Sequence, residues 1–426
     1  MTLAHRVDAA LHPDPSRVIG RLFLPGEHTA GGSRAAGIAE RALALDEDDV
    51  EVLAAGLLAD YAHRHRNYVE MLGTHAAAAS SHLPTAPPMS AARMIVLGAA
   101  FTAEYATEAA ALCNPSAVLH PDQGALDPGQ ARLALSLRGI GEGHVSCIGF
   151  ASAVVGPGPR WSYEARARPA VAGVRVLDVA PEPTSMYEVS FPVDVALSQR
   201  VLFPSASEES NGMEDARFVR FVSEDGSVGY RATYTAYDGR QIAPRLLTSP
   251  DLRTFRAHRL DGPAAHNKGM ALFPRLIGGR YLALCRIDGE SNWLSSSADG
   301  LNWDTPQRIE VPEQSWEVLQ IGNCGPPIET DRGWMVLTHG VGPMRAYGIG
   351  AILLDRCDPS KVLGRLKRPL LQADADERDG YVPNVVYSCG GIVHDGRLWI
   401  PYGIGDARIG VAWASVDDVL AEMIRR

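Results

Sequence analysis

The segment from Asn211 to Arg217 places two adjacent acids and a guanidinium between two runs that are typical of β-strands. The acids are Glu214 and Asp215, and the guanidinium belongs to Arg217. A carboxylate beside an arginine is oriented and stays ionised until a substrate displaces its partner, which suits acid–base chemistry. The alternative is a structural turn in which one acid caps backbone N–H groups and the arginine pairs locally.

Other polar residues cluster where further predicted strands end. Carboxylates, a few bases and aromatic rings together are typical of carbohydrate sites, because sugar hydroxyls need paired acceptors and pyranose faces need flat apolar surfaces. For any one of these positions alone, a surface or turn role is the alternative interpretation. The residues are Arg138, Glu142, His144, Tyr237, Asp238, Asn267, Lys268, Arg286, Asp288, Glu290, Trp316, Glu317, His339, Arg345, Asn384 and Asp406.

Composition narrows the classes of function. The chain of 426 residues is 46% hydrophobic and 21% charged, which is enough to bury one large core or two ordinary ones. Its net charge of −10 argues against a nucleic-acid or anionic-membrane partner. The six cysteines are widely spaced, so we expect buried free thiols and no metal site. Without a signal-peptide core or a long apolar run, a cytoplasmic enzyme is expected.

The elements that must position these residues change character along the chain. From Arg34 to Leu112 the sequence is Ala-rich with helical periodicity, and we expect three helices over 35–58, 58–75 and 90–112. After Asn114 short apolar or alternating runs follow at spacings of about 8 to 14 residues, which predicts an all-β sandwich, barrel or propeller. The segments 248–255 and 296–303 share a Ser-x-Asp turn and a closing aromatic residue, and this repetition favours a propeller.

Ordered motifs from Asn114 onward resemble glycoside hydrolase family 130. They are Glu214-Asp-Ala-Arg217, Thr235-Ala-Tyr-Asp-Gly239, Leu272-Phe-Pro274, Gly325-Pro-Pro-Ile328, Thr338-His-Gly-Val341, Gly350 to Asp355, Val382-Pro-Asn-Val-Val386 and Tyr402-Gly403 with Asp406. The resemblance implies a five-bladed β-propeller that acts on β-mannosides, either as a phosphorylase or as a β-1,2-mannosidase. We therefore expect a helical N-terminal extension over residues 1–110, of a kind that some members use in homo-oligomers, and a catalytic propeller over 111–426.

The resemblance also assigns roles within an inverting mechanism. Asp215 is expected to be the proton donor, acting through a hydroxyl of the bound mannose, with Arg217 orienting it and Asp406 holding mannose hydroxyls. Ala216 stands where the family usually has proline, a departure that leaves the chemistry unaffected. The expected substrate-binding residues are Asn114, Arg138, His144, Glu214, Arg217, Tyr237, Asp238, Lys268, Arg286, His339, Arg345, Tyr347, Asn384 and Asp406.

The group that attacks the anomeric carbon decides between two reactions. Phosphorylases bind inorganic phosphate through several basic side chains and a histidine, because a dianion needs several charge-assisted donors. Here Lys268, Arg286 and His339 match that cluster, but Gln320 stands where a lysine is usual and Lys268 replaces an arginine. Two nearby acids, Glu290 and Glu317, are candidates for the general base of an inverting hydrolase, although both could instead bind substrate hydroxyls.

The sequence therefore favours an exo-acting β-1,2-mannosidase on short oligosaccharides, without a metal or an organic cofactor. A β-1,2-mannoside phosphorylase that uses inorganic phosphate as co-substrate is the first alternative. A related β-mannosyltransferase and a catalytically inactive sugar-binding propeller are the others. Phosphate dependence separates the first two, and a requirement for an activated donor marks the transferase.

Overall fold

The structure is a computed structural model that describes residues 3–26, 28–29, 32–81, 88–179 and 186–424. The chain divides into two compact units. The larger comprises Met1–Asp14, Glu108–Arg166 and Ala172–Arg426, and the smaller comprises Pro15–Thr107 and Ala167–Val171. The first residues of the chain belong to the larger unit and not to a helical extension.

The described residues of the smaller unit form four α-helices and two short antiparallel pairs of strands, β2 with β5 and β3 with β4. Its elements are β2 (Val18–Leu22), β3 (His28–Thr29), β4 (Gly32–Ser33), α1 (Arg34–Leu43), α2 (Glu47–Tyr61), α3 (Tyr68–Ser80), α4 (Ala91–Ala100) and β5 (Thr102–Ala106), with β2 paired to β5. Three helices were expected, but a new helix starts at Glu47, where three consecutive acids favour a helix N-terminus. Gly98 lets α3 and α4 approach closely, since a Cβ there would lie 2.1 Å from the carbonyl oxygen of Leu72.

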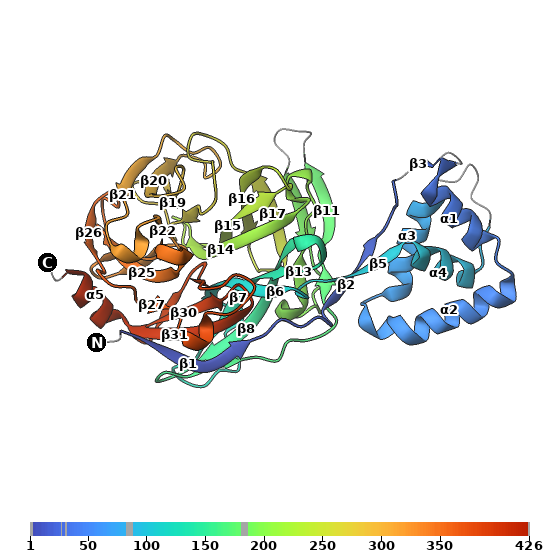
Figure 1. Cartoon of the computed structure of the whole chain (residues 1–426), viewed down its shortest axis with the longest axis horizontal. Coiled ribbons are helices and arrows are strands. Elements are labelled where there is room, and N and C mark those ends of the chain that lie inside the picture. The colour runs from blue at the N-terminus through green and yellow to red at the C-terminus, as the bar shows by residue number, and fades with distance from the viewer. Residues whose placement is uncertain (1–2, 27, 30–31, 82–87, 180–185, 425–426) are drawn as a thin grey trace. The chain divides into compact units, whose positions relative to one another are not determined.

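β-Strands form most of the larger unit, which confirms the expected all-β class (Figure 1). One 12-stranded sheet contains the first polar residues of the candidate site. Its strands include β6 (Ala111–Leu119), β7 (Ala131–Ile140), β8 (Ser146–Val155), β9 (Trp161–Tyr163), β11 (Val174–Val179), β12 (Met186–Ser190), β13 (Arg200–Leu202), β14 (Gly212–Val222), β15 (Val228–Tyr237), β16 (Ile242–Ser249) and β17 (Thr254–Arg259).

Three further antiparallel sheets follow along the chain. The first contains β18 (Ala271–Leu272), β19 (Tyr281–Cys285), β20 (Asn292–Ser297) and β21 (Gln307–Glu310). The second contains β22 (Gln320–Asn323), β23 (Ile328–Thr330), β24 (Gly333–Val341), β25 (Tyr347–Leu354), β26 (Val362–Arg365) and β27 (Leu371–Gln372). The third contains β1 (Ala4–Leu11), β28 (Val386–Tyr387), β29 (Ile392–His394), β30 (Arg397–Ile404) and β31 (Arg408–Ser415), before helix α5 (Val416–Ile424).

The two similar segments noticed in the sequence form equivalent turns. Between β16 and β17 the hydroxyl of Ser249 accepts a hydrogen bond from the backbone N–H of Leu252, at 2.8 Å. Between β20 and β21 Ser297 accepts one from Gly300, at 2.9 Å. The closing aromatic residues Phe255 and Trp303 are both 1% exposed. The repetition is therefore a repeated hairpin with a buried aromatic anchor.

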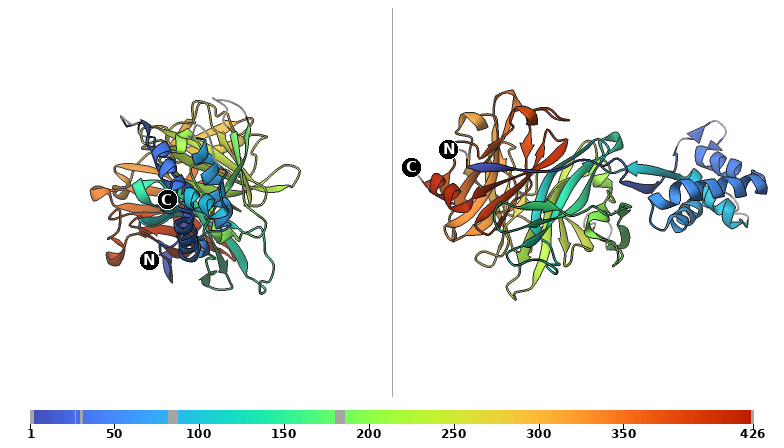
Figure 2. Two further views of the ribbon diagram at one scale, coloured as in Figure 1. Left: turned by 90° about the vertical axis from the view of Figure 1, so that its right-hand side faces the viewer. Right: turned by 90° about the horizontal axis from the view of Figure 1, so that it is seen from below.

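The first strand of the chain completes the last sheet. β1 pairs antiparallel with β31, with Ala4 opposite Ala414, and lies beside the red strands in Figure 2. Arg6 on β1 donates to both carboxylate oxygens of Glu377, at 3.0 and 2.6 Å. Glu377 is buried and also accepts a hydrogen bond from the hydroxyl of Tyr402, at 2.6 Å. This network ties the N-terminal strand to the segment that precedes β28.

None of the helices in the described part of the chain is long and apolar enough to span a membrane. Of the six cysteines, five are buried and Cys357 is exposed, and all are free thiols in this structure.

We expect Arg6→Ala to lower the free energy of unfolding by about 1–3 kcal/mol, because the buried carboxylate of Glu377 loses its two charge-assisted hydrogen bonds. Urea denaturation followed by tryptophan fluorescence measures the change. Arg332→Ala is the matched control, since that side chain is 67% exposed and should change stability by less than about 0.5 kcal/mol. Equal stability of the two variants would contradict a clamping role for Arg6.

Candidate active site

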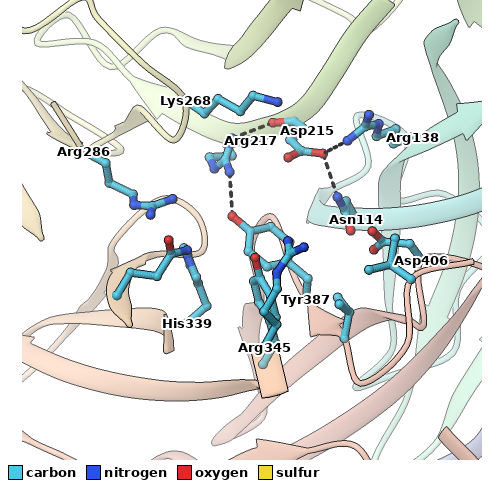
Figure 3. A pocket seen from close by; sticks show the side chains of 14 residues that line it. Asn114, Arg138, Asp215, Arg217, Lys268, Arg286, His339, Arg345, Tyr387 and Asp406 are labelled. Carbon is cyan, nitrogen blue, oxygen red and sulfur yellow. Dashed lines mark hydrogen bonds and ion pairs between the residues drawn. The ribbon is translucent and has the colours of Figure 1, made fainter. Parts of the chain in front are cut away.

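A pocket of about 230 Å³ collects polar side chains from all the sheets of the larger unit (Figure 3). Five of its lining residues are lysine or arginine, and two are aspartates. Aromatic and aliphatic side chains complete the wall. The lining residues are Asn114, Arg138, Asp215, Arg217, Lys268, Arg286, Gln320, His339, Arg345, Tyr347, Val382, Val385, Tyr387 and Asp406.

Local backbone irregularities aim several of these side chains into the pocket. The pairing register shifts between Cys113 and Ser116 on β6 and between Glu214 and Arg217 on β14. At these bulges Asn114 and Asp215 adopt left-handed φ angles of 48° and 54°. Non-glycine residues rarely adopt such angles, and they gather at functional sites. Asp406 in the β30–β31 turn, at 48°, and Arg345, at 53°, share this conformation.

Asp215 lies between two hydrogen-bond donors. Its Oδ1 accepts from Asn114 Nδ2 at 2.7 Å and from Arg138 Nη1 at 3.2 Å. Burial works to raise the pKa of Asp215, but the positive charges of Arg138 and Arg217 outweigh it and leave the pKa below its ordinary value. The ionised form of Asp215 is therefore favoured in the free pocket.

Glu214 stands behind Asp215 and is shared by two cations. Its carboxylate accepts from Arg138 Nη2 at 2.8 Å and from Lys268 Nζ at 2.5 Å. The Glu214 side chain is only 8% exposed, whereas that of Lys268 is 42% exposed. Glu214 thus fixes both cations at the pocket wall, although it does not itself line the pocket.

Arg217 is buried and directs its hydrogen bonds to neutral acceptors. Nε donates to the carbonyl oxygen of Cys324, Nη1 to the backbone oxygen of Asp215, and Nη2 to the hydroxyl of Tyr387, each at 2.9 Å. The contact with Asp215 is therefore to its backbone and not to its carboxylate. Arg217 holds the strained bulge in place and brings its positive charge to the pocket wall, where it also acts on the carboxylate of Asp215.

Arg286 and His339 form a second part of the cationic wall. Within the described structure the side chain of Arg286 makes one hydrogen bond, from Nη2 to the carbonyl oxygen of Gly289 at 2.6 Å, and its buried Nε has no partner. Burial lowers its pKa, and the charge of Arg217 adds to that effect. Burial and both arginines hold the pKa of His339 well below its ordinary value, so the ring is neutral. Its Nδ1 is likewise buried without a partner.

Gly322 makes this juxtaposition possible. A Cβ on Gly322 would lie 2.3 Å from Nε of Arg286 and 2.7 Å from Cε1 of His339. No side chain fits there, so the strand β22 lies directly against both groups. The ring of His339 also packs against Tyr347 and Tyr387, with centroid distances of 6.1 and 4.9 Å. Two arginines that have no ion-pair partner among the described residues, a neutral imidazole and a phenol hydroxyl therefore surround one part of the pocket, an arrangement suited to an anion.

Ten of the expected site residues line this pocket. They are Asn114, Arg138, Asp215, Arg217, Lys268, Arg286, His339, Arg345, Tyr347 and Asp406. Val382 and Val385 belong to the Val382 to Val386 motif but were not named as site residues, and Tyr387, directly after that motif, was not named either. An aromatic residue directly after a conspicuous motif is the signal that was missed.

Several other expected residues lie outside the lining. His144 is exposed on the turn after β7, where its Nδ1 contacts the hydroxyl of Tyr381. Tyr237 ends β15, and Asp238 after it accepts hydrogen bonds from the backbone N–H groups of Arg240 and Gln241, which is a turn role. The backbone of Asn384 bonds Tyr347 and Arg378 near the pocket wall. The side chains of these residues are thus absent from the described lining of the pocket.

The two candidate bases are absent from the described residues that line the pocket. Glu317 is 0% exposed, and its Oε1 accepts hydrogen bonds from the backbone N–H of Gln314 at 2.8 Å and from Arg365 at 2.5 Å. It therefore caps a 3-10 turn. Glu290 is exposed and is absent from the described residues that line the pocket. Among those lining residues the carboxylates are Asp215 and Asp406.

Comparisons with known proteins point to mannoside-cleaving enzymes. A family model of glycoside hydrolase family 130, described as beta-1,4-mannooligosaccharide phosphorylase, matches residues 188–425. A 1,2-beta-oligomannan phosphorylase of Thermoanaerobacter sp. (strain X514) is 36% identical over 230 residues, which cover 52% of this chain and 75% of that protein. A beta-1,2-mannobiose phosphorylase of the same organism is 36% identical over 219 residues, which cover 50% and 70%.

The solved structures agree on the fold. The beta-1,2-mannobiose phosphorylase of Listeria innocua, in complex with beta-1,2-mannobiose, superposes with a TM-score of 0.51 and 20% sequence identity. The match covers 74% of this chain and 92% of that one. At this identity the likeness concerns the fold alone.

We expect Glu317→Gln to destabilise the protein by about 1–3 kcal/mol while leaving kcat within a few-fold of the parent value, because the lost charge pairs with Arg365 and not with substrate. Urea denaturation and steady-state kinetics on the same preparation measure both quantities. A folded variant whose kcat falls by orders of magnitude would restore Glu317 as a candidate base.

Proposed function

The chain belongs to glycoside hydrolase family 130, and from this premise we propose that it is a β-1,2-mannoside phosphorylase. It would cleave the terminal mannose from a short β-1,2-linked oligosaccharide and transfer it to inorganic phosphate. The products are mannose 1-phosphate and a shortened sugar. The observation that carries the proposal is the part of the pocket formed by Arg217, Arg286 and His339, where two arginines lack a carboxylate partner within the described structure.

Arginines that lack an anionic partner within the described structure favour phosphate over water as the attacking group. Each arginine gains a charge-assisted hydrogen bond when a dianion enters, whereas a water molecule would leave both charges uncompensated. Hydrolysis by inversion needs a carboxylate base across the pocket from the acid. The two acids considered for that task, Glu290 and Glu317, are absent from the described lining. The geometry therefore supports phosphorolysis better than hydrolysis.

The named relatives support the same choice. The sequence favours hydrolysis because Lys268 replaces an arginine, and Gln320 a lysine, of the usual phosphate-binding cluster. The relatives matched at 36% identity are both phosphorylases, which supports the alternative. Lys268 pairs with Glu214 in this structure, so its contribution to phosphate binding is secondary to that of Arg217 and Arg286.

The remaining parts of the proposal concern the sugar and the scaffold. Asp215 and Asp406 provide the carboxyl chemistry on the side where the mannose binds, and Tyr347 with Val382 and Val385 supplies an apolar wall for its ring. We infer that the larger unit is the catalytic domain and that its strands form five blades, the last completed by β1. Inversion at the anomeric carbon follows from direct displacement by phosphate.

The direct test is product analysis after incubation with β-1,2-mannobiose. We expect mannose 1-phosphate and mannose when phosphate is present, and no cleavage without it. Ion-exchange chromatography separates the products. Release of mannose in phosphate-free buffer would establish hydrolysis instead, and formation of new mannosides only from an activated donor would establish a transferase.

We expect Arg286→Gln to raise the KM for phosphate by about 10- to 100-fold, because the variant loses one charge-assisted hydrogen bond, which is worth about 1.5–3 kcal/mol. The KM for β-1,2-mannobiose should change by less than about threefold. Initial-rate kinetics with each substrate varied in turn measures both. Arg332→Gln serves as the control because its side chain is exposed on a turn. An unchanged KM for phosphate would place the anion site elsewhere.

A further inference from the structure

A second polar pocket lies at the other end of the strands that carry Asp215. Its volume is about 360 Å³, and its described lining shares no residue with that of the candidate active site. On β14 and β15, Glu214 lies opposite Thr235, whereas Phe221 in the second pocket lies opposite Gly229. Strand residues rise by about 3.3 Å each, so roughly 20 Å of β14 separates Asp215 from Phe221. The second pocket is therefore a separate site.

Arginines and hydroxyl groups predominate in this second pocket, which we call the hairpin pocket. It is lined by residues of the β14–β15 and β16–β17 hairpins, and its described lining contains two arginines and no aspartate or glutamate. The paired positions of Arg231, Thr248 and Arg256 on β15, β16 and β17 place their side chains on one face of the sheet. Ser223 and Thr254 supply further hydroxyl groups. Such a lining suits an anion that also carries polar groups.

Arg231 is held in a fixed orientation without a carboxylate partner. Its guanidinium carbon lies 4.1 Å from the ring centroid of Phe221 and 4.9 Å from that of Tyr281. Within the described structure its side chain makes one hydrogen bond, from Nη2 to the hydroxyl of Tyr281 at 3.4 Å. Most of its five N–H donors are therefore available to a ligand. Because two aromatic rings already fix the guanidinium, binding an anion costs little additional side-chain order.

Acids on the neighbouring segments are already engaged. Glu188 on β12 accepts a hydrogen bond from Nε of Arg256, at 2.7 Å. Asp225 accepts one from a backbone N–H of its own turn, and Asp251 accepts two from backbone N–H groups of its turn. None of these acids forms an ion pair with Arg231 in the described structure, so the positive charge of that arginine remains available to an anion.

We propose that the hairpin pocket binds the phosphate monoester of a sugar. Arg231 and Arg256 hold the phosphate group, because a dianion takes charge-assisted hydrogen bonds from several donors. Hydroxyl groups such as those of Thr248 and Thr254 hold the sugar, for which the pocket has more room than a phosphate ion needs. A nucleotide fits less well, since Phe221 and Tyr230, the aromatic residues of the described lining, are 3% and 4% exposed and offer no open ring face to a base.

Crystals soaked with mannose 1-phosphate test the location, because electron density distinguishes the two pockets. No acceptor sugar is added, so the ligand stays intact. We expect it in the hairpin pocket of the parent protein and of Arg286→Gln. Arg231→Met should lose it, since methionine keeps an apolar chain over Phe221 and Tyr281 but has no N–H donor. An empty hairpin pocket in the parent crystals would overturn the proposal.

Titration calorimetry in the Arg286→Gln background tests the class of ligand, because that variant weakens the candidate active site as the competing anion site. We expect the Kd of mannose 1-phosphate to be at least about tenfold lower than that of inorganic phosphate, and mannose alone to show no binding. Adding Arg231→Met should raise the Kd of mannose 1-phosphate by at least about tenfold, because charge-assisted hydrogen bonds are lost. Equal affinity for inorganic phosphate would overturn the assignment to a sugar phosphate.

Arg308→Met in the same background is the matched control. Arg308 also lies over an aromatic ring, 5.8 Å from the centroid of Trp293, but its pocket contains the carboxylates Glu310 and Glu313. We expect this variant to leave the Kd of mannose 1-phosphate within about twofold. A loss of affinity as large as that of Arg231→Met would overturn the proposal. The site does not depend on the proposed function: if it binds the sugar phosphate while the parent protein fails to phosphorolyse mannosides, the site stands and the proposed function fails.

Discussion

Burying a positive charge is costly unless an anion or several hydrogen bonds accompany it. Arg217 and Arg286 meet that requirement only in part, because their hydrogen bonds end on carbonyl oxygens and one phenol. Several other arginines of the larger unit are paired, as Arg6 is with Glu377 and Arg138 with Glu214. The free pocket therefore holds positive charge that an entering anion neutralises, and the proposed choice of phosphate over water follows from this imbalance.

The surrounding structure maintains that imbalance. Two β-bulges turn Asn114 and Asp215 out of their strands and into the pocket. On the opposite side the bare backbone of Gly322 lets Arg286 and His339 come together. Carboxylates are thereby gathered where a sugar would lose its leaving group, and cations where phosphate would attack. Strands far apart in the sequence must meet to build both halves.

The sequence predicted the all-β class and ten of the pocket residues because their motifs are contiguous and ordered. It failed where the answer depends on contacts between distant residues. Glu317 was expected to be a base, but its carboxylate is taken by Arg365, 48 residues away. The residues of β1 were expected to belong to a helical extension, but they form a strand that pairs with β31, about 400 residues further along the chain. A local sequence pattern shows neither where a side chain points nor which strands pair when they lie so far apart in the sequence.

A crystal structure of the protein with bound phosphate tests the central claim most directly. The account predicts one phosphate ion in the pocket, within hydrogen-bond distance of the guanidinium groups of Arg217 and Arg286 and of the ring of His339. The same crystals of Arg286→Gln should lack it at equal phosphate concentration. A pocket that stays free of phosphate in the parent protein, or an ion bound only at another surface, would contradict the account.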